Sequence, residues 1–324
     1  MSADALPQAS PGGLAVGASP AAAAISALPV PPSRLGESPF WHPGEAALYW
    51  CDIAGHALHR FAPATQQHRR WDFDSEPGCC APLPGGELLL ALREGLIRFD
   101  PASGRRTPLL PAPYGRSEQR FNDGKADPMG RLWVGTIFEP RSRAGAALYC
   151  FAGGRIERVA DQVTVSNGLA FSPDARTLYW SDTSAHRIFA FDFDLGAGTL
   201  ARRRVFAEFE AKPAGADAPG YRGRPDGAAV DAEGAYWVAM YEGQRLLRLS
   251  ARGELLADLA LPVRCPTMPC FGGPDLKTLF ITTAREARPQ AELAAQPLAG
   301  CVLSLPVTVP GLPVNFARLP DGGS

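Results

Sequence analysis

Four polar residues occupy equivalent places in the sequence, each at the start of a short apolar stretch that precedes a turn. They are Glu37, Asn122, Asn167 and Asp226, within Gly36-Glu37-Ser38, Phe121-Asn122-Asp123, Ser166-Asn167-Gly168 and Pro225-Asp226-Gly227. Carboxylate and amide oxygens suit a hard divalent ion such as Ca²⁺, Mg²⁺ or Mn²⁺, and they also tolerate Zn²⁺. Asn-Gly and Asp-Gly pairs also make ordinary turns. Four such positions in one register favour a shared site over four unrelated turns.

A repeat of short strands must position these residues. Six copies of a turn followed by an apolar, often aromatic strand begin about 41, 44, 46, 58 and 43 residues apart, which is typical of propeller blades. The repeated strands begin at Ala47, Leu88, Leu132, Leu178, Tyr236 and Leu279. Several following segments alternate apolar and polar residues, the period of a half-buried strand. The sequence therefore predicts an all-β protein.

The predicted architecture is a six-bladed β-propeller, with an open sandwich or barrel as the alternative. The innermost strand of each blade lines the central channel, and in this repeat it precedes the turn. The first residues of all six inner strands should then meet at one mouth of the channel. This places Glu37, Asn122, Asn167 and Asp226 around one axis as oxygen donors.

Composition limits the classes of partner. The 324 residues are 46% hydrophobic and carry a net charge of −1, so the chain shows no basic surface for nucleic acid and none is expected as a partner. No apolar run approaches the roughly 18 residues of a membrane helix, so no membrane association is expected. Seven cysteines without metal-type spacing indicate reduced thiols and a cytoplasmic protein.

The domain boundaries follow from composition. Residues 1–33 are rich in Ala and Pro and are predicted to be a disordered tail, with a late strand from Ile25 to Val30 as an option. An export signal is the alternative, but prolines interrupt the segment and no basic residue precedes Arg34. Residues 34–320 are predicted to form the propeller. The segment before Arg34 could add an outer strand to the last blade beside Asn315 to Leu319.

Other residues fit packing better than chemistry. His56 and His59 could suggest a metal site with Asp52, but they fall on strands away from the channel mouth. Four tryptophans recur on the second strand and are expected in the core, namely Trp50, Trp133, Trp180 and Trp237. Asp123 either supports its neighbour Asn122 or makes a turn. Glu286 to Ala299 is the one segment predicted to contain a short helix.

The chain resembles the regucalcin/gluconolactonase family, the senescence-marker-protein type of sugar lactonases, from about Arg34 to Pro306. The matching pieces occur in order and at blade spacing. They are Leu35-Gly36-Glu37-Ser38-Pro39, Arg120-Phe121-Asn122-Asp123-Gly124-Lys125, Ser166-Asn167-Gly168-Leu169, Pro225-Asp226-Gly227, Cys270-Phe271-Gly272-Gly273 and Thr282-Thr283-Ala284-Arg285. The order and spacing make the joint match more specific than any single piece.

The resemblance implies a role for each matching position. Glu37, Asn167 and Asp226 correspond to ligands of one divalent metal ion, and Asp226 also to the proton acceptor. Arg120 and Asn122 correspond to residues that hold sugar hydroxyls. Glu139 lies near a family carboxylate that touches substrate, although the local sequence departs from the family pattern. The segment Glu208 to Arg224 is longer than in short members and could shape the pocket.

The expected reaction is metal-dependent hydrolysis of a small sugar lactone, such as a glucono-, arabinono- or xylonolactone, to the aldonic acid. A metal ion polarises the carbonyl, and Asp226 assists the attack of water. No Gly-x-Ser-x-Gly motif occurs, so a covalent acyl-enzyme is not expected. The alternatives are a non-catalytic calcium-binding regulatory propeller and a propeller hydrolase acting on other esters or phosphotriesters.

Overall fold

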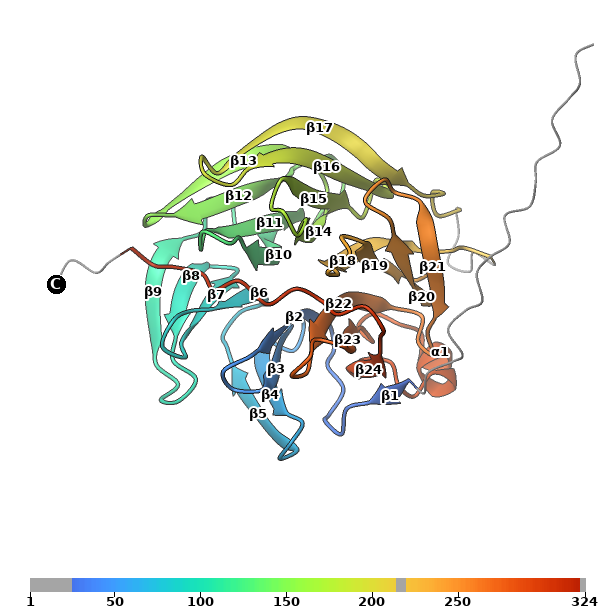
Figure 1. The fold of residues 1–324 in the computed structure, drawn as a ribbon. Helices are drawn as coiled ribbons and strands as arrows, with labels where there is room; N and C mark the ends of the chain where they lie inside the picture. The colour runs from blue at the N-terminus through green and yellow to red at the C-terminus, as the bar shows by residue number, and fades with distance from the viewer. Residues whose placement is uncertain (1–24, 214–219, 321–324) are drawn as a thin grey trace, which may run out of the picture.

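The computed structural model describes residues 25–213 and 220–320, which form a ring of six four-stranded antiparallel sheets around a central channel (Figure 1). This confirms the predicted all-β, six-bladed propeller. Residues 1–24, most of the predicted tail, lie outside the described residues, as do residues 214–219 of the long segment Glu208 to Arg224.

Each of the first five blades contains four consecutive strands. Blade 1 contains β2 (Gly36–His42), β3 (Ala47–Asp52), β4 (Ala57–Ala62) and β5 (Gln67–Asp72), and blade 2 contains β6 (Pro77–Pro82), β7 (Leu88–Leu92), β8 (Gly95–Phe99) and β9 (Arg106–Pro111). Blade 3 contains β10 (Gln119–Ala126), β11 (Leu132–Phe138), β12 (Ala146–Ala152) and β13 (Arg155–Val163). Blade 4 contains β14 (Ser166–Phe171), β15 (Thr177–Asp182), β16 (Arg187–Asp194) and β17 (Thr199–Glu208), and blade 5 contains β18 (Arg224–Val230), β19 (Tyr236–Tyr241), β20 (Arg245–Leu249) and β21 (Leu255–Ala260).

Blade 6 closes the ring with strands from both ends of the described chain. It contains β22 (Pro266–Gly272), β23 (Thr278–Thr283), β24 (Leu303–Pro306) and the outer strand β1 (Ser26–Ala27). Ser26 lies opposite Ser304, so the partner of β1 is β24 and the predicted pairing with Asn315 to Leu319 is wrong. The propeller consequently begins before Arg34. The short helix α1 (Gln290–Ala295) lies between β23 and β24, inside the segment predicted to contain one.

An aspartate in the turn between the first and second strands of a blade stabilises both strands through its side-chain carboxylate. In blade 5, Asp231 accepts hydrogen bonds from the backbone N–H groups of Glu233 and Ala235 and from the indole N–H of Trp237, each at 2.9–3.0 Å. Gly234, at φ +83°, takes the left-handed conformation that closes this turn. Asp127 makes the equivalent bonds in blade 3. One aspartate therefore fixes both the turn and the core tryptophan.

The hydrophobic core lies between neighbouring blades, where their apolar faces meet. Trp133 of blade 3, for example, packs edge-on against Phe171 and Phe193 of blade 4, with ring centroids 6.3 and 5.4 Å apart. The inner strands β2 and β14 are buried along their whole length, and β18 is buried at every residue after Arg224, as expected for a packed ring. Among the described residues, no helix is long and apolar enough to cross a membrane.

Residues 311–318, the C-terminal crossing segment, run over the end of the channel where the inner strands finish (Figure 1). The backbone N–H of Gly311 donates to Leu276 in blade 6 at 2.9 Å. At the other end, Ala317 donates to Pro82 of blade 2 and Arg318 to Gly130 of blade 3, both at 2.8 Å. The segment therefore joins opposite sides of the ring and covers one mouth, leaving the other mouth, where the inner strands begin, for the predicted site.

Candidate functional site

The inner strands share an irregularity close to their first residues. In all six, the register with the second strand shifts there, the sign of a β-bulge. The shifts lie between Glu37 and Phe40, Pro77 and Cys79, Phe121 and Gly124, Asn167 and Ala170, Pro225 and Ala228, and Pro266 and Met268. A bulge bends its strand and changes the direction of nearby side chains. Four of these bulges begin at or next to the predicted donors, and pattern reasoning on the sequence did not detect them.

Three of the four predicted donors are joined in one hydrogen-bonded chain across blades 3, 4 and 5. The side-chain amide of Asn122 donates to Oδ1 of Asn167 at 2.8 Å, and the amide of Asn167 donates to Oδ1 of Asp226. Asn167 also donates to the hydroxyl of Thr183 at 2.9 Å. The side chains of Asn122, Asn167 and Asp226 are all buried. The predicted convergence of Asn122, Asn167 and Asp226 is therefore present.

Glu37 reaches the same region from blade 1. Its side chain is buried, and its only hydrogen bond among the described residues comes from the backbone N–H of Ser38 at 3.2 Å. Burial raises the pKa of Glu37 well above its usual value, and the charges of Asp226 and Asp123 raise it further. The effect of Asp226 on this pKa indicates that the two carboxylates belong to the same site, and the charge of Arg120 opposes the shift.

Asp226 is also a buried acid whose surroundings disfavour its charged form. Burial raises its pKa to about 8, the charge of Arg224 opposes this effect, and the charge of Asp123 adds to it. Glu37 and Asp226 are both hard to ionise in the metal-free protein. A bound cation would stabilise their charged forms, so the two carboxylates favour cation binding.

The donor set fits a hard divalent ion. Among the described residues, no group of three His, Cys, Asp or Glu side chains is placed to hold a metal, so a site here must include amide oxygens. Glu37, Asp226 and Asn167 supply two carboxylates and one amide, which is typical of Ca²⁺ or Mg²⁺ ligation. Asn167 now turns its nitrogen toward Asp226. Exchange of its amide nitrogen and oxygen by a half-turn would complete the set.

Arg120 lies beside this chain of bonds, next to Asn122. Its Nη1 donates to Oδ1 of Asn122 at 2.7 Å and to the backbone carbonyl of Phe121 at 2.9 Å. Burial lowers the pKa of this guanidinium, and the charge of Glu139 opposes that effect. Arg120 thus sets the orientation of Asn122, and through it the orientation of Asn167.

Glu139 follows β11 at the edge of the mouth. Its carboxylate is 3.8 Å from Nε of Arg120 but pairs mainly with Arg93, whose Nη2 lies 2.8 Å from Oε1. The side chain is 37% exposed, much more than the predicted metal ligands. Arg93 also binds Glu76 at 2.7 Å, so Glu139 belongs to an ion-pair network that supports Arg120 from the outside.

Two further residues support the site: Thr183, which sequence reasoning missed, and Asp123, to which it assigned no single role. Thr183, directly after β15, accepts the second hydrogen bond of Asn167, and nothing in its spacing distinguished it from other turn residues. Asp123 was left between two interpretations and is buried, with Oδ2 accepting from the backbone of Leu169 at 2.7 Å. Its Oδ1 has no hydrogen-bond partner among the described residues. Asp123 therefore supports the strand after Asn167 and adds negative charge below the site.

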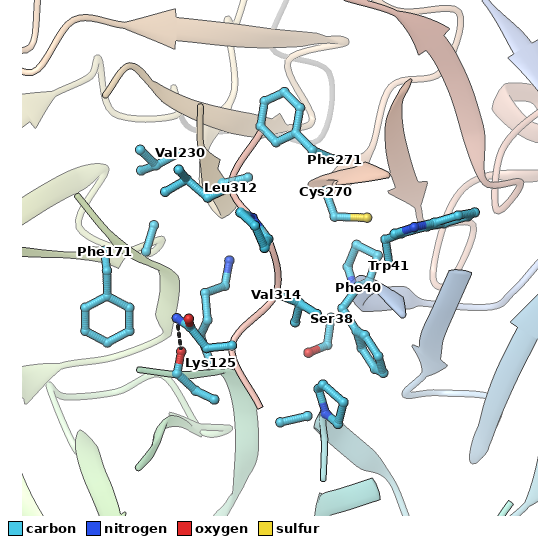
Figure 2. A pocket seen from close by; sticks show the side chains of 18 of the residues that line it. Ser38, Phe40, Trp41, Lys125, Phe171, Val230, Cys270, Phe271, Leu312 and Val314 are labelled. Atoms are coloured by element: carbon cyan, nitrogen blue, oxygen red, sulfur yellow. Dashed lines mark hydrogen bonds between the residues drawn. The ribbon is translucent and has the colours of Figure 1, made fainter. Parts of the chain in front are cut away.

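A separate cavity of about 310 Å³ occupies the channel beyond these donors, under the C-terminal crossing segment. It is lined by later residues of the inner strands, including Phe40, Phe171 and Val230 (Figure 2). Figure 2 shows Lys125 extending among these apolar side chains, and its ammonium donates to the backbone carbonyl of Ala228 at 3.0 Å. This cavity is distinct from the site at the open mouth, since none of the six predicted site residues lines it.

Comparison with known proteins is consistent with this geometry. The SMP-30/Gluconolactonase/LRE-like region model matches residues 35–285. The chain is 43% identical over 281 residues to 6-deoxy-6-sulfogluconolactonase of Pseudomonas putida, a match that covers 86% of this chain and 94% of that protein. It is 34% identical over 287 residues to regucalcin of Danio rerio, covering 87% and 94%. A solved calcium-binding protein, regucalcin from Agrobacterium tumefaciens str. C58, superposes with a TM-score of 0.85 at 28% identity, covering 92% and 98%.

Proposed function

The chain belongs to the SMP-30/gluconolactonase/LRE-like family, and we propose that this sugar lactonase hydrolyses an aldonolactone to the aldonic acid with one divalent metal ion. The observation that carries the proposal is the hydrogen-bonded chain from Asn122 through Asn167 to Asp226 at one mouth, together with the buried carboxylate of Glu37, whose pKa the charge of Asp226 raises. Glucono-, arabinono- and xylonolactone are the candidate substrates.

In this proposal Glu37, Asn167 and Asp226 would hold the ion, and Ca²⁺, Mg²⁺, Mn²⁺ and Zn²⁺ are the candidates. When bound, the ion supplies Lewis-acid polarisation of the lactone carbonyl and charge for the developing oxyanion. In the present orientation Asn167 accepts from Asn122 and donates to Thr183, so the half-turn that presents its oxygen to the ion must also exchange these two hydrogen bonds. The bulges in β2, β14 and β18 provide the bends that bring these side chains to one point.

Proton transfer and substrate binding are carried out by side chains of the protein. Asp226 accepts a proton from the water that adds to the carbonyl carbon, a contribution of about 10²–10⁴-fold for a positioned base. The ring C–O bond then breaks, and the leaving oxygen takes a proton to give the open-chain acid. Arg120 donates hydrogen bonds to the sugar hydroxyls, Oδ1 of Asn122 accepts one from them because both of its amide N–H groups are engaged, and Glu139 contacts the substrate from the edge of the mouth.

The test is a panel of hexono- and pentonolactones assayed with EDTA-treated protein and with Ca²⁺, Mg²⁺, Mn²⁺ or Zn²⁺ restored in turn. We expect hydrolysis that EDTA abolishes and at least one ion restores. Equal rates with and without EDTA would refute the metal requirement, and absence of hydrolysis across the panel would refute the proposed activity. Asp226→Ala should remove turnover under every condition.

A non-catalytic calcium-binding regulator is the second candidate. It is favoured by the similarity to regucalcins, one of which is described as a calcium-binding protein. This function predicts Ca²⁺ binding by calorimetry without turnover on any lactone. The same lactone panel therefore separates the two candidates.

We further propose that the protein acts in the cytoplasm. All seven cysteines are free thiols in the structure, and six of them are buried. Reduced cysteines in a chain of this size fit a reducing compartment. Fractionation of the native host, followed by immunodetection, tests the location.

A further inference from the structure

Basic side chains gather around one buried carboxylate on the wall of the open mouth that blades 5 and 6 form. Glu242, directly after β19, is only 5% exposed. Its carboxylate lies 2.9 Å from the ammonium of Lys212, 2.9 Å from Nη1 of Arg288 and 3.3 Å from Nη2 of Arg224. Three basic side chains therefore contact the single carboxylate of Glu242.

This group lies next to the catalytic centre. Arg224 begins β18 two residues before Asp226, and its guanidinium lies over the ring of Tyr241, 5.2 Å from the centroid. A molecule bound by Asp226 is thus within reach of the same wall.

The charges on this wall do not balance among the described residues. Arg288 also binds Glu292 at 2.7 Å, and Arg264 lies 3.8 Å from the same carboxylate. Four basic side chains, Lys212, Arg224, Arg264 and Arg288, thus face three acidic ones, Glu242, Glu292 and the nearby Asp226. The four are only 12–29% exposed, so water screens them poorly. Nε of Arg264 is buried without a hydrogen-bond partner.

The opposite wall differs. There the less exposed guanidinium groups are already neutralised, because Arg93 and Arg120 face Glu76 and Glu139. Arg141, also on that side, is exposed, where water and salt weaken its charge. The wall around Glu242 is therefore the side of the mouth whose positive charge is not neutralised and could bind an anion.

We propose that the wall around Glu242 binds an anionic group, in the first place a sulfonate, at the end of the lactone remote from its carbonyl. This rests on the proposed lactonase function and specifies its substrate class. A sulfonate presents three oxygens to Lys212 and Arg224, and charge-assisted bonds of this kind are the stronger class of hydrogen bond. The chain's 43% identity to 6-deoxy-6-sulfogluconolactonase supports the choice of anion.

The experiment compares kcat/KM for gluconolactone with kcat/KM for its 6-sulfonated, 6-phosphorylated and 6-carboxylate analogues. We expect the wild type to prefer the sulfonated lactone. Lys212→Met should reduce that preference by about 10- to 100-fold, the value of one charge-assisted bond, and Lys212→Arg should retain most of it. Arg252→Gln, which removes one exposed positive charge from the turn between β20 and β21, is the matched control and should leave the preference unchanged.

Added salt should lower the preference of the wild type, since screening weakens attraction for the charged substrate only. A wild type that treats neutral and charged lactones alike, or a preference that Lys212→Met does not alter, would overturn the anion site while leaving the lactonase proposal intact. Preference for the phosphate or carboxylate would overturn the sulfonate assignment. If no lactone is hydrolysed, the lactonase proposal fails, and weaker binding of the sulfonated acid to Lys212→Met by calorimetry decides the anion site separately.

Discussion

Replacing Asp226 with Asn should stabilise the metal-free protein, although it removes the proposed base. Burial raises the pKa of Asp226 from 3.8 to about 8. Each pKa unit corresponds to about 1.36 kcal/mol, so the fold disfavours the ionised form by about 6 kcal/mol. Because the folded pKa lies above the unfolded one, the folded state retains a proton that the unfolded state releases. The contribution to stability is complete below about pH 4 and is lost as pH rises toward 8.

The assay is urea unfolding of wild type and Asp226→Asn in EDTA at pH 5 and pH 8. Between these pH values the free energy of unfolding of wild type should fall, relative to the variant, by about 4 kcal/mol. Asp74→Asn, at an exposed aspartate, is the control and should show no such pH dependence relative to wild type. Ca²⁺ at about 100 times its Kd should restore about 2.7 kcal/mol to wild type at pH 8 and little to the variant.

One result would refute the reasoning. If the difference between Asp226→Asn and wild type is the same at pH 5 and pH 8, Asp226 is not a buried acid with a raised pKa in the metal-free protein. The electrostatic argument for a cation between Glu37 and Asp226 would then fail.

Three further outcomes follow from the contacts. Arg120→Lys should lower kcat/KM for any lactone substrate by about 10- to 100-fold, because a flexible ammonium cannot keep the planar geometry in which Nη1 contacts both Asn122 and Phe121. Steady-state kinetics with unchanged thermal stability would confirm it. Gly78→Ala should lower the free energy of unfolding in urea by about 1–3 kcal/mol, because a Cβ at this position would lie 2.4 Å from backbone of the next blade. Gly115→Ala is the control, since a Cβ there meets nothing within 4 Å. Ending the chain at Pro310 should lower the melting temperature and make thiols of the covered cavity reactive toward a thiol reagent, and unchanged reactivity would show that the segment does not close the channel.

The fold could be predicted because its signal is repetitive. Six turns and strands at blade spacing identify a propeller even though each copy is weak. The way in which blade 6 closes the ring could not be predicted, because a two-residue strand such as Ser26–Ala27 carries no periodic pattern. Residues 315–319, assigned in the sequence to an outer strand, cross the channel instead, since apolar residues suit either place.

At the site, the sequence determined which residue types stand at the start of each inner strand, and hence that Glu37, Asn122, Asn167 and Asp226 converge. Only the tertiary structure decided how they interact. The order Arg120–Asn122–Asn167–Asp226 arises from bulges in three different blades, and the raised pKa of Asp226 arises from burial against groups distant in sequence. The surplus positive charge around Glu242 has the same origin, because Lys212, Arg224 and Arg288 come from separate segments that only ring closure brings together. Residue identity is local information, whereas burial and charge balance depend on what the fold places nearby.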